Sequence, residues 1–383
     1  MSPRVPEQSH FPRVDSFRRL FSAALTFGSI LLIFYVLTLG KHFFVPLVIA
    51  FLAVYLIEIL GRVVSRITIA GHSLPRPVAL FISALIIFGI SFVLGAIVAD
   101  NAVKVAAAAP RYQARLHRVE ADLFRQLGVQ EPHELLGLAQ TIDLKALFSA
   151  LAASVADLIQ GSFLVIIYAL FILLEIRFLP AKLVALFPDS GRRQRFLYNW
   201  HRIDRDIHTY LGVKTVVSLT SAVLAYILMR IVGLDFAEFW ALLLFVLHFI
   251  PTIGIVVATA LPTLLAAVQF DHWGPVFAIG IGITAIAQLM GNVVEPNVMG
   301  ETLNLSPLTV ILSLILWGST WGITGAFLCV PLTVICVIVL SNFKSTRWIS
   351  ILLSKTGQIH SAEASRNDAA QAEISRNDVR NST

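Results

Sequence analysis

Long runs of apolar residues alternate with polar segments along the chain, and this pattern gives the first prediction of the fold. Five such runs precede the last third of the sequence, at residues 20–39, 43–60, 78–99, 158–174 and 213–231. Each is close to the ~20 residues that a helix needs to cross the hydrocarbon core of a bilayer. The pattern predicts an all-α, polytopic membrane protein with these runs as transmembrane helices.

Two further apolar runs, residues 239–270 and 308–340, are too long for a single crossing. Each would extend for about 50 Å as a straight helix, against a hydrocarbon core of about 30 Å. Both are interrupted near the middle by Pro or Gly, which break helical hydrogen bonding or free the backbone. Each run is either one kinked span or a re-entrant helical hairpin. The residues expected at the two breaks are Pro251, Thr252, Gly254, Gly318, Ser319, Thr320 and Gly322.

We favour the hairpins, because broken backbone at membrane depth is tolerated only where it is buried in protein or lines a cavity. Paired segments interrupted by Gly or Pro are also the best sequence indication of a transporter site. The hairpin topology makes the two units enter from opposite faces of the membrane. The residues at the breaks are therefore candidates for binding a solute or an ion through backbone amides and carbonyls.

A regular apolar span at residues 275–294 separates the two broken runs and carries polar groups. Thr284, Gln288, Asn292 and Glu295 follow one another at spacings of four, four and three residues, which places them on one face of an α-helix. Intramembrane ionisable groups are costly and usually face a cavity or a partner. We expect Gln288, Asn292 and Glu295 to contact solute or ion. The alternative is a capping or interhelical role at the helix end.

Other ionisable residues stand in or beside apolar runs. His248 precedes the first break, and together with Glu295 it is a candidate for proton coupling, although a hydrogen-bonded packing histidine is the more frequent role. Glu58 has Arg62 four residues further on, which predicts an interfacial ion pair. Lys214 is expected to be a snorkelling anchor.

Composition agrees with a membrane location. Of 383 residues, 57% are hydrophobic and 14% are charged, whereas a soluble domain has about 45–50% and about 25%. These values exclude a soluble globular enzyme and a disordered chain. We attribute the net charge of +6 to basic cytoplasmic loops and expect no nucleic-acid partner. The sequence contains no zinc-ligand spacing, P-loop or His-Glu-x-x-His motif, so we expect no metal and no cofactor.

The distribution of Lys and Arg predicts the orientation, with both termini in the cytoplasm. The expected organisation is a cytoplasmic N-terminal segment (1–19), three transmembrane helices (20–99), an extracytoplasmic helical segment (100–157), a fourth transmembrane helix (158–176), basic amphipathic cytoplasmic helices (177–212), a core transport region (213–345) and a cytoplasmic tail (346–383) with a disordered end.

The basic segment carries an apolar stripe at helical spacing, formed by Phe196, Trp200, Ile203, Ile207 and Leu211. Such a stripe beside several Arg residues is typical of an amphipathic helix on an anionic membrane surface. It is equally typical of a helix packed on its own protein or on a neighbouring subunit. Both interpretations stay open at the level of sequence.

Three blocks of sequence resemble the AI-2E (autoinducer-2 exporter, PerM-like) transporter family, over about residues 18–345. They are Phe249–Gly254 with its Ile-Pro-x-x-Gly pattern, Asn292–Pro296 followed by Gly300 and Pro307, and Gly318, Gly322, Gly325 and Pro331. The chain departs from the family at two positions, with His248 where many relatives have Asn and Lys214 where many have Gln.

The resemblance implies about eight membrane segments, a location in the cell inner membrane and a homo-oligomer, with a pentamer as the best expectation. It implies a secondary transporter that exports a small polar solute such as autoinducer-2, a quorum-sensing molecule, by alternating access. Other members of the family imply the alternative of a sodium(lithium)/proton antiporter. A membrane scaffold or regulator that transports nothing is the alternative from another functional class. We do not expect an enzyme.

Overall fold

The computed structural model describes residues 28–29, 31–69, 72–127, 163–186, 189–299, 304–341 and 346–357. Helices dominate these residues. Six of them are long and apolar enough to cross a membrane, namely Lys41–Val64, Arg76–Ile97, Phe163–Leu186, Phe196–Val232, Trp273–Met299 and Pro307–Ser341. Two shorter apolar helices are Ala237–Leu247 and Ile253–Gln269. The predicted all-α polytopic membrane fold is confirmed; the segments 1–19 and 128–162 and the end of the tail lie outside the described residues.

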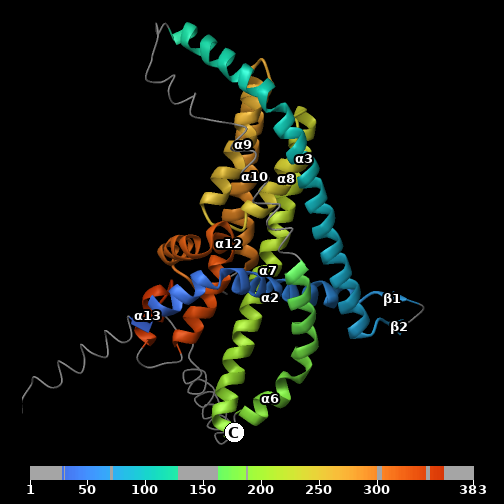
Figure 1. Ribbon diagram of the computed structural model, residues 1–383, viewed down its shortest axis with the longest axis vertical. Coiled ribbons are helices and arrows are strands. Elements are labelled where there is room, and N and C mark those ends of the chain that lie inside the picture. The colour runs from blue at the N-terminus through green and yellow to red at the C-terminus, as the bar shows by residue number, and fades with distance from the viewer. Residues whose placement is uncertain are drawn as a thin grey trace, which may run out of the picture.

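The N-terminal part forms one flank of the molecule. A helix at 31–39 ends at Gly40, and α2 (Lys41–Val64) comes next and crosses α7 in Figure 1. A short antiparallel hairpin of β1 (Thr68–Ile69) and β2 (His72–Ser73) then leads into α3. Such a small hairpin was not predicted for this polar loop.

Two predicted boundaries fall inside continuous helices. α3 (Arg76–Leu127) runs without a break through residue 100, because strong helix formers such as Ala106–Ala109 continue the helix where the chain becomes polar. α7 (Ser190–Val232) likewise runs through residue 213. The division of the chain at 100 and 213, which concerns membrane and polar regions and not helix ends, stays a prediction.

α7 is the central element of the fold. It is capped by the Asp189 side chain, which accepts a hydrogen bond from the Gly191 amide, and it ends at Gly233 in the left-handed conformation. The C-terminal half of its predicted stripe, Ile207 and Leu211, is buried against residues of α2 and α12. For these residues the structure supports packing on the protein itself. Residues 163–175, η1 (Ile176–Phe178) and α6 (Leu179–Leu186) form a further helical arm.

The first broken run is a hairpin of α8 (Ala237–Leu247) and α9 (Ile253–Gln269). Its two ends lie side by side. The Gln269 side chain donates to the Gly233 carbonyl at 2.8 Å and accepts from the Asp235 amide at 2.8 Å. A single kinked span would hold these ends far apart, so the hairpin prediction is confirmed for this run.

The second broken run, α12 (Pro307–Ser341), also folds back on itself. Both of its ends contact α13 (Arg347–Leu353): Thr309 donates to the Leu353 carbonyl at 2.8 Å, and Ser350 donates to the Val337 carbonyl at 3.1 Å. The reversal takes place at Gly322, whose φ of 66° and ψ of −143° are not helical. The second hairpin prediction is therefore also confirmed.

The predicted extent of the second break needs correction. Residues 318–321 continue the first helical arm, and Gly322 alone leaves the helix. The hydroxyls of Ser319 and Thr320 both donate to the Leu316 carbonyl, the usual local bond of such residues within a helix. The break was placed too broadly because a Gly-Ser-Thr sequence is tolerated in a helix when its hydroxyls are bonded in this way.

Each hairpin depends on a glycine where its two arms approach most closely. A Cβ on Gly254 would lie 1.8 Å from the Leu247 carbonyl oxygen, and a Cβ on Gly325 would lie 1.9 Å from that of Trp317. Any larger residue would force the backbones of the arms apart. The two hairpins thus share one local design.

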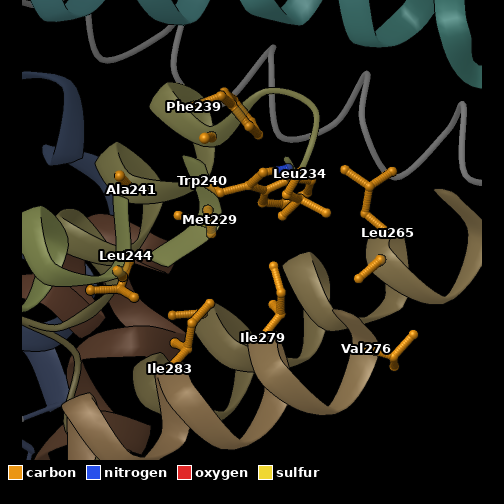
Figure 2. Packing of buried hydrophobic residues seen from close by; sticks show 14 of the residues in the cluster. Met229, Leu234, Phe239, Trp240, Ala241, Leu244, Leu265, Val276, Ile279 and Ile283 are labelled. Atoms are coloured by element: carbon orange, nitrogen blue, oxygen red, sulfur yellow. The ribbon is translucent and has the colours of Figure 1, made fainter. Parts of the chain in front are cut away.

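A buried apolar cluster fixes the first hairpin on its neighbours. Figure 2 shows Trp240 and Leu244 of α8 close to Met229 of α7 and to Ile279 and Ile283 of α10 (Trp273–Leu289). These side chains are almost wholly buried, and within a membrane they stabilise the contact through close van der Waals packing. The first hairpin is therefore held as one unit with α7 and α10.

Candidate functional site

The tips of the two hairpins meet. The rings of Phe249 and Phe327 lie 4.7 Å apart, centroid to centroid. Ile250 of the first tip shares a buried cluster with Trp317 and Trp321 of the second hairpin. Two segments about seventy residues apart in sequence are thus brought to one place beside α7.

A π-helical turn interrupts the regular span next to these tips. α10 ends at Leu289, η2 (Met290–Val294) is a π-helix, and α11 (Glu295–Met299) comes directly after it. A π turn contains about one residue more than an α turn, so it rotates the side chains beyond it by roughly 100° about the helix axis. Isolated π turns are frequent at functional sites.

The predicted polar stripe is therefore divided. Thr284 donates to the Gly280 carbonyl, and Asn292 bonds Gln288 on an exposed face of the helix. Glu295, beyond the π turn, points instead toward α7, and 17% of its side chain is exposed. The prediction that these groups form one continuous face is wrong, because it assumed a regular α-helix.

Lys214 of α7 meets Glu295 in a buried ion pair. The Lys214 Nζ donates to both carboxylate oxygens at 2.9 Å, and only 9% of its side chain is exposed. The expectation of a snorkelling anchor was wrong, because a counter-charge inside the protein replaces water as the partner of the ammonium. The ion pair joins α7 to the end of the π turn.

His248 completes this polar group. It is the C-terminal cap of α8, at the start of the first tip, and its Nε2 lies 4.0 Å from a carboxylate oxygen of Glu295. The side chain is 2% exposed, and Nε2 has no hydrogen-bond partner within the described part of the chain. A buried ring nitrogen without a partner next to a carboxylate is a candidate for contacting a ligand, and the role of His248 in proton coupling stays a prediction.

Further unpartnered polar atoms accompany the ion pair. Gly291 of the π turn faces His248: a Cβ atom added to Gly291 would lie 4.0 Å from the Nε2 of His248. On α7, the hydroxyl oxygens of Thr215, which follows Lys214 directly, and of Ser218, one turn beyond Lys214, are buried and form no hydrogen bond among the described residues. Buried polar atoms in native proteins are usually bonded, so these are candidates for contacting a ligand.

The residues predicted at the breaks take different positions. Gly254 is buried between the arms, whereas Thr252, Ser319 and Gly322 are exposed at the outer side of the turns. The Gly254 amide already bonds the Ile250 carbonyl at 3.2 Å. Pro251, Gly318 and Thr320 are partly buried. The role of these seven residues in binding stays a prediction.

A second polar contact corrects the sequence interpretation of Glu58. Its carboxylate lies 3.3 Å from the Nε2 of His208 on α7, and the Arg62 side chain contacts the Glu58 backbone carbonyl instead. The ring of Tyr55 stands edge-on to His208 at 4.5 Å. The cluster joins α2 to α7, and no signal within α2 predicted it.

The described ranges offer no evident site for metal chemistry. Within them, no group of three or more His, Cys, Asp or Glu side chains is arranged to hold a metal ion. Cys329 is buried and Cys336 is exposed, and both are free thiols.

The profile of the AI-2E family transporters matches residues 27–345 of this sequence. The chain is 34% identical over 220 residues to the AI-2 transport protein TqsA of Escherichia coli (strain K12), which covers 57% of the chain and 63% of TqsA. It is 29% identical over 222 residues to the protein YhhT of the same strain, whose name gives transport as an inferred function. The match covers 58% of this chain and 62% of YhhT.

A Haemophilus influenzae protein, likewise named as an inferred transport protein, is 32% identical over 202 residues, which are 52% of this chain and 57% of that protein. In all three comparisons the match spans less than two thirds of the relative's own length. The relatives agree on transport as a general function.

Proposed function

This chain belongs to the AI-2E transporter family, and from that premise we propose that it is a secondary transporter that moves a small polar solute by alternating access. The observation that carries the proposal is the meeting of two helical hairpin tips beside the buried Lys214–Glu295 pair. Charged groups within a membrane are costly and mark solute or ion pathways. Broken helices that meet at such a group are typical of transporter binding sites.

In this proposal the two hairpins move separately. The base of the α8–α9 hairpin is joined to α7, whereas the base of the α12 hairpin is joined to α13. In Figure 1 the first hairpin lies above α12, and α13 lies below it, so the bases are on different sides of the meeting point. Opening the Phe249–Phe327 contact from one side at a time would expose Glu295 to each side of the membrane in turn.

We propose that the solute is autoinducer-2 and that it is exported. The name of TqsA as an AI-2 transport protein and the family resemblance support this choice, and the unpartnered hydroxyls of Thr215 and Ser218 are suitable partners for a small hydroxylated solute. The excess of Lys and Arg in the N-terminal segment and tail supports cytoplasmic termini and an inner-membrane location. A homo-oligomer, with a pentamer as the first expectation, belongs to the same proposal.

A sodium(lithium)/proton antiporter is the second candidate. The observation that favours it is the 4.0 Å separation of His248 Nε2 and the Glu295 carboxylate, two groups that can exchange protons. It predicts proton movement that depends on sodium or lithium.

Flux measurements in proteoliposomes distinguish these functions. Vesicles that contain the purified full chain are loaded with autoinducer-2, and its release is compared with that from protein-free vesicles. A second set contains a pH-sensitive dye and receives pulses of sodium or lithium. Release of autoinducer-2 with no cation-dependent pH change supports the first proposal; a pH change without release of autoinducer-2 supports the antiporter.

A further inference from the structure

We infer that the ammonium group of Lys214 takes the place of a coupling cation at Glu295, so that this chain works without sodium or lithium at that carboxylate. The inference rests on the proposed function, because it assumes that Glu295 belongs to the transport site. It goes further by assigning the ion specificity of the site to one residue of α7.

The contact geometry is the first argument. The Lys214 Nζ lies 2.9 Å from each oxygen of the Glu295 carboxylate, so it occupies the position between them where a bound cation would sit. An alkali cation needs several oxygen ligands. A cation bound to Glu295 would have to displace the ammonium or share the carboxylate with it, at the cost of repulsion between like charges.

The covalent attachment of the ammonium to α7 is the second argument. Lys214 is held on the same α7 that packs against α10 and the π turn, so its ammonium is always present beside Glu295. A free cation must compete with a group whose effective concentration is set by the fold and not by the solution. Burial strengthens the advantage, because a cation that took Glu295 from Lys214 would leave an ammonium that is only 9% exposed without a counter-charge.

The surrounding groups are the third argument. His248 approaches Glu295 from the first hairpin tip, and Tyr210 and Cys329 are buried nearby on α7 and α12. Among these groups it is Lys214 whose ammonium contacts the Glu295 carboxylate. The negative charge of Glu295 is thus balanced by Lys214, and the pair offers no net negative charge to an additional cation.

Thermal unfolding of the purified full chain in detergent tests this inference. Melting temperatures are compared in sodium, lithium and N-methylglucamine chloride at equal ionic strength, for the wild type and for the Lys214→Gln, Lys214→Gln/Glu295→Gln and Lys182→Gln variants. Lys182 is the matched control, because it also pairs with a carboxylate, that of Glu175, but at an exposed position.

We expect the wild type and Lys182→Gln to melt at the same temperature in all three salts. Lys214→Gln should melt about 2–4 °C higher in sodium or lithium than in the organic cation, because a vacated carboxylate binds the ion only in the folded state. The double variant should lose this difference.

Stabilisation of the wild type by sodium or lithium overturns the inference, as does a folded Lys214→Gln variant that is insensitive to the cation. If Lys214→Gln does not fold, Lys214→Met is used in its place under the same criteria, and the wild-type measurement can still overturn the inference alone. The assay measures binding and not flux. Absence of autoinducer-2 release would therefore count against the proposed function without deciding the role of Lys214.

Discussion

Lys214 and Glu295 are 81 residues apart in sequence, yet the Lys214 ammonium donates to both oxygens of the Glu295 carboxylate at 2.9 Å. Three structural features bring about this contact. α7 continues unbroken through Lys214, the π turn rotates Glu295 toward it, and the first hairpin places His248 against the same carboxylate. The charged centre is thus a product of tertiary structure.

Removing one member of this pair should cost more stability than removing both. Lys214→Met should lower the free energy of unfolding by about 3–5 kcal/mol, because it leaves a buried carboxylate without a counter-charge. Lys214→Met/Glu295→Gln should cost less than Lys214→Met alone. Denaturant unfolding in micelles measures both, with the exposed Lys182→Met as control. Additive costs would contradict a coupled pair.

The hairpin glycines should tolerate no side chain. Gly254→Ala and Gly325→Ala place a Cβ within 2 Å of a backbone carbonyl oxygen, and we expect each to lower the free energy of unfolding by about 3 kcal/mol or more. Gly89→Ala is the matched control, since this helical glycine has open space around it and alanine favours the helix. Wild-type stability of either hairpin variant would mean that the arms are further apart than described.

Two neighbouring residues of α3 hold the base of the first hairpin with different strength. Tyr112 is buried and donates to the Asp235 carboxylate at 2.6 Å; burial, helped by this hydrogen bond, raises the pKa of its phenol to about 12. The phenol therefore stays a donor at neutral pH. Arg111 reaches the same carboxylate at 3.2 Å, but its side chain is 69% exposed.

Tyr112→Phe should accordingly cost about 1.5–3 kcal/mol of stability, as expected for a lost hydrogen bond to a charged acceptor. Arg111→Met should cost about 1 kcal/mol at most, because exposed ion pairs are weak. Thermal or denaturant unfolding of the two variants side by side measures the difference. A larger effect at Arg111 than at Tyr112 would contradict the described burial of this contact.

The sequence predicted the positions of the apolar segments and of both breaks well. Pro251 and Gly254 stand at the first turn, and Gly322 is where the second arm reverses. These features arise from local chemistry, namely the length of the apolar runs, the missing amide donor of Pro and the conformational freedom of Gly. The close contact at Gly325 was not predicted, because it depends on the approach of the opposite arm.

The charged site was predicted only in part. Glu295 and His248 were chosen because ionisable groups in apolar runs are unusual, but the stripe from Thr284 to Glu295 assumed α-helical geometry throughout. No residue type signals a π turn reliably. One signal could have identified Lys214: opposite charges inside a membrane pair with each other, and Lys214 and Glu295 lie in or next to two apolar segments.

The two hairpin bases should lie on opposite sides of the membrane. In a background with both native cysteines replaced by alanine, Asp271→Cys at the base of the first hairpin should react with an impermeant maleimide from outside intact cells. Arg347→Cys, next to the base of the second hairpin, should react after permeabilisation only. Reaction of both positions from the same side would contradict the opposed arrangement and the expected cytoplasmic C-terminus.

The most direct measurement is the initial rate of autoinducer-2 release from proteoliposomes that contain equal amounts of wild-type, Glu295→Gln or Lys182→Gln protein. We expect release by the wild type and by Lys182→Gln at similar rates. Glu295→Gln should be at least about tenfold slower, since a lost charged contact in a buried site costs about 1.5–3 kcal/mol. An unchanged rate for folded Glu295→Gln, or wild-type release no faster than from protein-free vesicles, would contradict a transport site at the meeting hairpin tips.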